Sequence, residues 1–128
     1  MIGYVTLGTN DIARAARYYD DLLSVMGAKR TLETEKFIAW GNDPNGPALL
    51  LIKPADGNKA TVGNGVMVAL AAKNKAEVDA VYQKAISLGS KCEGPAGPRG
   101  ESFYAGYFRD ADGNKLCAFC AGRHLPLA

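Results

Sequence analysis

The thiol and imidazole groups are the side chains of this 128-residue sequence best suited to chemistry, and they are few. There are three cysteines, Cys92, Cys117 and Cys120, and one histidine, His124. A thiolate can attack an electrophile or bind a metal ion, and an imidazole can transfer a proton or bind a metal ion. A single histidine excludes a site with two histidine ligands, and we expect His124 to be exposed or to pack in a dimer interface.

Cys117 and Cys120 have the C-x-x-C spacing of some redox sites, but the residues around them predict a strand. Residues three apart in a strand point to opposite faces, so this pair is not expected to form a disulfide. The odd number of cysteines fits reduced thiols. For Cys117 three interpretations stay open: a small buried side chain, which we favour, a reactive pocket thiol, and a metal ligand.

The elements that must position these side chains form an internal repeat. When the sequence is shifted by 63 residues, residues 4–7 align with residues 67–70. When it is shifted by 67 residues, residues 39–46 align with residues 106–113. The sequence therefore predicts two similar halves of about 64 residues.

Each half has the pattern of one strand, one helix and three further strands. The first strands are predicted at residues 3–8 and 65–71. An amphipathic helix follows from Asp11, with Thr9 or Asn10 as its cap, and the second helix starts at Asn74. The further strands are predicted at residues 28–33, 36–41, 47–53, 90–93, 102–109 and 115–121.

Three irregular stretches connect these elements. Asp-Pro-Asn-Gly and Asp-Ala-Asp-Gly are predicted to form the hairpin turns before the last strand of each half. Residues 54–65 are rich in Gly, Asn and Asp and are predicted to be a linker. The stretch EGPAGPRGE, with Arg99 near its end, is too irregular for a predicted strand and is a candidate for a mobile flap.

The composition is that of an ordinary globular protein, with 48% hydrophobic and 22% charged residues. The net charge is +2 and the basic residues are scattered among acids, so no nucleic-acid partner is expected. The longest apolar run, at residues 48–52, is too short to cross a bilayer, so no membrane partner is expected. The start lacks the pattern of a signal peptide, and we expect a cytoplasmic location.

The sequence resembles the vicinal oxygen chelate superfamily, also called the glyoxalase/bleomycin resistance/dioxygenase superfamily. The resemblance rests on MIGYVTLGTNDIARAARYYDDLL, VMVALAAKNKAEVDAVYQKAISLG and FYAGYFRDADGNKL, in this order along nearly the whole chain. It implies an α+β fold in which tandem βαβββ modules form a half-open curved sheet around one small-molecule cavity. Residues 1–128 would then form a single domain with module one at about 1–55, a linker at 54–65 and module two at about 65–128, and we expect a homodimer.

In proteins of this superfamily, four side chains from the first and last strands of the two modules hold a divalent metal ion. The resemblance maps these positions to Tyr4, Leu50, Met67 and Cys117, where the family pattern has His or Glu. Leucine has no lone pair to donate, and a phenol, a thioether and a single thiol do not form a coherent ligand set. We therefore expect no metal ion and no other cofactor.

The same four positions would form an apolar cavity floor that carries one phenol. Trp40 aligns with Tyr107 in the repeat, so these two aromatic side chains are predicted to share an orientation, and Arg99 could meet an anionic group of a ligand. The predicted ligand pocket comprises Tyr4, Trp40, Leu50, Met67, Arg99, Tyr104, Tyr107 and Cys117.

Three functions remain open from the sequence. The favoured hypothesis is a protein that has lost the family metal site and binds a small, partly apolar molecule between its modules. One alternative is a metal-free enzyme that uses Tyr4 or Cys117 as acid, base or nucleophile. Another is a lyase, isomerase or dioxygenase with an atypical divalent metal site.

Overall fold

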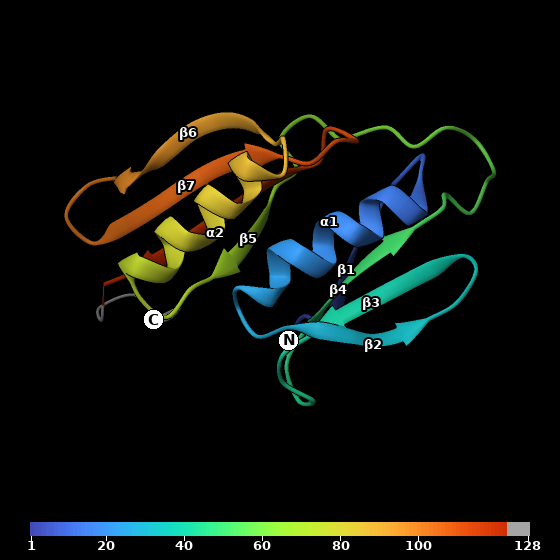
Figure 1. Cartoon of the computed structure of the whole chain (residues 1–128), viewed down its shortest axis with the longest axis horizontal. Coiled ribbons are helices and arrows are strands. Elements are labelled where there is room, and N and C mark those ends of the chain that lie inside the picture. Colours follow the sequence, from blue (N-terminus) through green and yellow to red (C-terminus); the bar gives the residue numbers. More distant parts are fainter. Residues whose placement is uncertain (123–128) are drawn as a thin grey trace. The chain divides into compact units, whose positions relative to one another are not determined.

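The computed structural model describes residues 1–122 and confirms an α+β fold with two copies of the βαβββ module. The chain divides into two compact units, Met1–Gly63 and a second that begins at Asn64. In each unit, one helix lies across one face of a four-stranded sheet (Figure 1). No helix within the described residues is long and apolar enough to span a membrane.

The first unit contains one helix and four strands, and its sheet order is β1-β4-β3-β2. β1 runs parallel to β4, whereas β3 is antiparallel to both β4 and β2. The elements are β1 (Tyr4–Gly8), α1 (Ile12–Ser24), β2 (Lys29–Glu33), β3 (Phe37–Gly41) and β4 (Ala48–Ile52).

The second unit repeats this topology, with the sheet order β5-β8-β7-β6. β5 is parallel to β8, and β7 is antiparallel to β8 and β6. The elements are β5 (Val68–Ala71), α2 (Lys75–Ser87), β6 (Lys91–Pro98), β7 (Phe103–Arg109) and β8 (Lys115–Ala121). β5, the first strand of this unit, starts at Val68, three residues later than predicted, because Gly65 has a φ of 92° and lies in a turn.

Side-chain caps fix where both helices begin. The side chain of Asn74 accepts a hydrogen bond from the Glu77 amide at 2.9 Å, which confirms Asn74 as the start of α2. In α1 the cap is Asp11, whose carboxylate accepts from the Arg14 amide at 3.1 Å. The prediction of Thr9 or Asn10 was wrong here: the Thr9 hydroxyl instead accepts from the amide of Asp11, which precedes the first turn of the helix.

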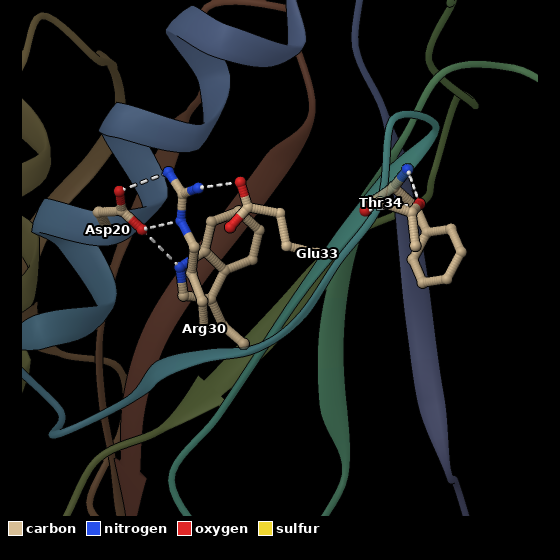
Figure 2. Close-up of polar contacts among 6 residues, drawn as sticks. Asp20, Arg30, Glu33 and Thr34 are labelled. Atoms are coloured by element: carbon tan, nitrogen blue, oxygen red, sulfur yellow. Dashed lines mark hydrogen bonds and ion pairs between the residues drawn. The ribbon is translucent and has the colours of Figure 1, made fainter.

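A polar cluster joins α1 to the neighbouring strands at the edge of the first unit (Figure 2). Asp20 of α1 accepts hydrogen bonds from Arg30 Nε at 2.8 Å, Arg30 Nη2 at 2.7 Å and Trp40 Nε1 at 2.9 Å. Arg30 also forms an ion pair with Glu33 at 3.2 Å. Arg30 lowers the pKa of the Asp20 carboxyl, mainly through its hydrogen bonds, and the carboxylate in turn satisfies the N–H of the buried Trp40 indole.

The predicted hairpin turns are both present. The Gly46 amide donates to the Asp43 carbonyl at 3.0 Å, and the Gly113 amide donates to the Asp110 carbonyl at 3.0 Å. Gly113 has a φ of 92°, the left-handed conformation that favours glycine at this point of the turn.

The predicted flap is largely a strand, and this corrects the sequence-based interpretation. β6 continues to Pro98 and pairs with β7, with register shifts between Cys92 and Gly94 and between Gly94 and Gly97. β6 lies at the edge of its sheet, where bulges and prolines are tolerated because one side of the strand needs no ladder partner.

Candidate functional site

Each sheet has one face covered by its own helix and one that is not, which we call the helix-free face. In the first unit, Trp40 marks the covered face, because its indole donates to Asp20 of α1. In the second unit, Tyr104 marks it, because its hydroxyl donates to Asp79 of α2 at 2.7 Å. Because side chains alternate along a strand, every second residue counted from these two points to the covered face, and the residues between them point to the helix-free face.

The helix-free face of the first unit carries Tyr4 and Leu50. Tyr4 pairs with Ala48, and Thr6 pairs with Leu50, so side chains of β1 and β4 alternate in step. Tyr4 is 64% exposed, whereas Leu50 is half-buried. The structure thus brings these two predicted residues to one face of one sheet.

Cys117 and Tyr107 share the helix-free face of the second unit, where they are directly opposite each other in the β7–β8 pair. Cys117 is also paired with Ala69 of β5. Met67 lies just before β5 and is 40% exposed. The structure therefore brings Cys117 together with Tyr107 and places Met67 two residues before Ala69.

A compact apolar cluster occupies this face. Ala105, Cys117 and Phe119 form its buried centre. The rings of Phe103 and Phe119 stack at a centroid distance of 5.5 Å. Phe103, Tyr107 and Ala121 are partly buried against the centre, so the cluster has apolar atoms at its accessible margin.

Burial determines the chemistry of the Cys117 thiol. Its side chain is 1% exposed, and this burial raises the pKa of the thiol to about 11, although the charge of Lys115 acts in the opposite direction. A thiol with such a pKa is protonated at neutral pH and is a poor nucleophile.

Two predicted pocket residues lie on the covered faces instead. Trp40 is 1% exposed and packs beneath α1, with its ring 5.9 Å from that of Tyr19. Tyr104 is held by Asp79, which raises the pKa of the Tyr104 phenol. Neither ring lies on the face that carries Tyr4 and Leu50 or Cys117, so placing them with those residues was wrong.

The prediction that Trp40 and Tyr107 share an orientation was also wrong, and a one-residue difference explains it. Trp40 is opposite Leu49 in the β3–β4 pair of the first unit. The residue at the equivalent position in the β7–β8 pair of the second unit is Phe108, which is opposite Leu116, and not Tyr107. The first unit has one more residue, Asn42, between its strand and the hairpin turn. A slip of one residue moves a side chain to the other face of a sheet.

Arg99 and Lys115 both approach the Tyr107 ring. The guanidinium carbon of Arg99 lies 5.5 Å from the ring centroid and Lys115 Nζ lies 5.6 Å from it, which places both cations within range of the π system. Arg99 was predicted to lie at the pocket. Lys115 was not, although its position two residues before Cys117 in a predicted strand was a signal for the same face.

A hollow of about 250 Å³ lies within the second unit near the end of β8, and Phe103 and Ala121 of the apolar cluster are among its lining residues. Tyr104 is the member of the predicted pocket that lines it, and Lys75, Cys120 and residues between Pro98 and Phe103 also line it. The amine of Lys75 lies 5.6 Å from the centroid of the Tyr104 ring. This hollow therefore involves the half-buried thiol of Cys120 rather than Cys117.

The donor groups at the four family metal positions do not fit a divalent ion. Leu50 has no donor, Met67 offers a thioether, and the Cys117 thiol retains its proton at neutral pH. Within residues 1–122, no three His, Cys, Asp or Glu side chains are grouped so that they could hold a metal ion. His124 lies outside the described residues, and so does the prediction made for it.

Comparison with known proteins agrees with the topology. The model of the Glyoxalase/Bleomycin resistance protein/Dioxygenase superfamily matches residues 1–118, so the chain belongs to this superfamily. A glyoxalase/bleomycin resistance protein from Albidiferax ferrireducens is 32% identical, with a TM-score of 0.85 over 94% of this chain and 98% of that one. No curated protein matches the chain significantly.

More distant structures share the fold. A lactoylglutathione lyase from Agrobacterium tumefaciens is 24% identical, with a TM-score of 0.69, over 94% of this chain and 92% of that one. A glyoxalase/bleomycin resistance protein/dioxygenase family enzyme from Burkholderia phytofirmans is 17% identical, with a TM-score of 0.73, over 93% of this chain and 97% of that one. At these identities the similarity establishes the fold and not the reaction.

Proposed function

We propose that this protein binds a small, partly apolar molecule on the helix-free faces of its sheets and does so without a divalent metal ion. The observation that carries the proposal is the apolar cluster around Cys117, at a position where the superfamily resemblance implies a metal ligand. An apolar surface with a few polar groups at its margin is the usual lining of a small-molecule site. Tyr107, Arg99 and Lys115 supply such polar groups here.

The chemistry of the site supports binding over catalysis by Cys117. A nucleophilic cysteine needs an accessible thiolate, whereas Cys117 is 1% exposed and its pKa is raised to about 11. The similar protein from Albidiferax ferrireducens is described as a glyoxalase/bleomycin resistance protein, a description compatible with a small-molecule ligand. A homodimer, which the resemblance implies, belongs to the same proposal and is checked by light scattering.

A fragment screen with the isotope-labelled full chain tests the proposal. We expect the bound fragments to shift the amide resonances of Ala69, Cys117 and Phe119, which lie on the helix-free face of β5 and β8. In the variant Ala69→Phe, a ring at an exposed position paired with Cys117 should reduce affinity by roughly tenfold. The matched control is Ala80→Phe, on an exposed position of α2.

Metal analysis of the purified protein completes this test. We expect no stoichiometric metal and no change of melting temperature with nickel, zinc or manganese, because the donors at the four positions do not match these ions. Fragments that bind only elsewhere, or equal loss of affinity in Ala69→Phe and Ala80→Phe, would contradict the proposed binding face. A tightly bound divalent ion would contradict the metal-free part.

A further inference from the structure

The helix-free face of the second unit combines its apolar cluster with basic side chains. Lys115, Cys117 and Phe119 follow one another at every second position of β8 and therefore point to this face. Across the pair, Arg109 is opposite Lys115 and Tyr107 is opposite Cys117. The cations thus lie at one end of the cluster, next to an aromatic ring.

Arg99 is held in a defined position at the same ring. Its guanidinium donates to the backbone carbonyls of Pro95 at 2.6 Å, Gly97 at 3.0 Å and Pro98 at 3.3 Å. A Cβ atom on Gly94 would lie 3.2 Å from Arg99 Nη2 and 3.3 Å from a carbon of the Tyr107 ring, so the missing side chain leaves room for both groups. These contacts use three of the five guanidinium N–H groups. A cation fixed in advance loses little conformational entropy when it binds an anion.

The local charges are not balanced by acids. Arg109 forms an ion pair with Glu93, and both side chains are less than one-third exposed. Arg109 lowers the pKa of the Glu93 carboxyl, and the charges of Lys91 and Lys115 lower it further. Within the described part of the chain, Arg99 and Lys115 have no carboxylate at ion-pair distance. The Glu93 carboxylate therefore faces three cations, Arg109, Lys91 and Lys115, while Arg99 lies at the Tyr107 ring that Lys115 also approaches.

We infer that the ligand of this face is an organic carboxylate: its carboxylate group binds at Arg99 and Lys115, and its apolar part lies against Phe103, Tyr107 and Ala121, the partly buried margin of the apolar cluster. This inference rests on the proposed function and names the class of its ligand. Two unused guanidinium N–H groups and one ammonium group match the two oxygens of a carboxylate. Tyr107 contacts both cations and also packs against the apolar cluster, so it links the charged part of the site to the apolar part.

A pair of probes of nearly equal shape tests this inference. Phenylacetate and phenylacetamide differ in charge but share the ring and its spacer, and both are titrated at millimolar concentration into the labelled full chain. We expect phenylacetate to bind roughly tenfold more tightly than phenylacetamide, and added salt to weaken only phenylacetate. In Lys115→Gln and Arg99→Gln, the affinity for phenylacetate should fall roughly fivefold to tenfold, while that for phenylacetamide stays unchanged.

The control variant is Lys84→Gln, which removes the same charge from an exposed position of α2, on the other side of the sheet. Because Arg99 also holds its own backbone, Lys115→Gln decides the result if Arg99→Gln lowers the melting temperature. Equal binding of the two probes on this face, unchanged in Lys115→Gln, would overturn the carboxylate inference and leave the proposed function intact. If neither probe shifts a resonance of this face and the fragment screen also finds no ligand there, both fail.

Discussion

At the scale of single residues, two cysteines of the second unit illustrate how surroundings determine reactivity. Cys117 is buried in the apolar cluster. Cys92 is exposed, and its sulfur accepts hydrogen bonds from the Tyr82 hydroxyl at 2.9 Å and from the Gly94 amide at 3.3 Å. A reagent can reach the exposed Cys92 sulfur, whereas the apolar cluster shields the Cys117 thiol and its burial raises the pKa of that thiol. The two thiols should therefore react very differently with the same reagent.

We expect a disulfide reagent at pH 8 to modify Cys92 rapidly and Cys117 only after the protein unfolds. The variants Cys92→Ser and Cys117→Ser assign the phases when the reaction is followed by absorbance. Loss of the fast phase in Cys117→Ser, with Cys92 intact, would contradict this assignment and would reopen a reactive role for Cys117.

The raised pKa of Cys117 also has a consequence for stability at alkaline pH. Because the pKa of this thiol is about 11 in the folded protein and its ordinary value is 9.0, the unfolded chain loses the proton first. The stabilising contribution is complete below pH 9 and is lost as the pH rises towards 11. Relative to Cys117→Ala, the wild-type free energy of unfolding should therefore fall by about 2 kcal/mol over this range. Urea titrations of the wild type and of Cys117→Ala at several pH values measure the two free energies of unfolding. A difference between them that does not change from pH 9 to pH 11 would contradict the prediction.

At the scale of elements, the packing of α2 on its sheet depends on a glycine of β7. A Cβ atom on Gly106 would lie 2.9 Å from Tyr82 Cδ1 in α2 and 3.2 Å from the backbone of Ala96 in β6. The helix and two strands therefore approach one another at a point where only a hydrogen atom fits.

We predict that Gly106→Ala lowers the free energy of unfolding by about 1–3 kcal/mol, because the new methyl group must displace the Tyr82 ring or the β6 backbone. The matched control is Gly3→Ala, where an added Cβ would meet no atom within 4 Å. Chemical denaturation followed by circular dichroism measures both variants. A Gly106→Ala protein as stable as Gly3→Ala would show that α2 does not pack as closely as described.

The elements themselves were largely predictable, because their signals are local. The repeat, the helix start at Asn74 and both hairpin turns follow from periodicity, capping chemistry and turn residues within a few positions. The orientation of Trp40 was not predictable from the repeat alignment, since the extra residue Asn42 between β3 and the hairpin turn shifts the register by one position. The beginning of β6 was predicted at residues 90–93, but its continuation to Pro98 was missed because its glycines and prolines disfavour a strand locally, whereas pairing with β7 overrides that preference.

At the scale of the whole molecule, the candidate site was only partly predictable. The mismatch with metal chemistry follows from the residue types at the four positions that the superfamily resemblance implies, so sequence reasoning reaches it, and the absence of a metal ion stays a prediction. The position of Lys115 beside the Tyr107 ring, and that of Arg99 in the space that Gly94 leaves there, depend on how neighbouring strands pair. Such contacts join residues from different strands, and no single stretch of sequence encodes them.

The linker between the two units is fastened to the first one, which its composition did not indicate. The side chain of Asn10 accepts a hydrogen bond from the Ala60 amide at 2.7 Å and donates to the Ala60 carbonyl at 3.2 Å. Ala60 is buried, and its Cβ lies 3.1 Å from the position that a Cβ on Gly8 would occupy. The segment before Gly63 is therefore part of the first unit, whose boundary with the second falls between Gly63 and Asn64.

This attachment predicts how the chain responds to protease. Trypsin can cleave after Lys59 only when the segment around Ala60 leaves its place on the first unit, because a protease needs an extended, accessible backbone. In Asn10→Ala both hydrogen bonds to Ala60 are lost, so the free energy of this local opening falls by about 1–2 kcal/mol and cleavage becomes roughly fivefold to thirtyfold faster. The control is Asn45→Ala, at a position whose backbone amide donates to the Asp43 carboxylate. Mass spectrometry of timed digests identifies the cut, and equal rates at Lys59 in the two variants would show that Asn10 does not hold the linker.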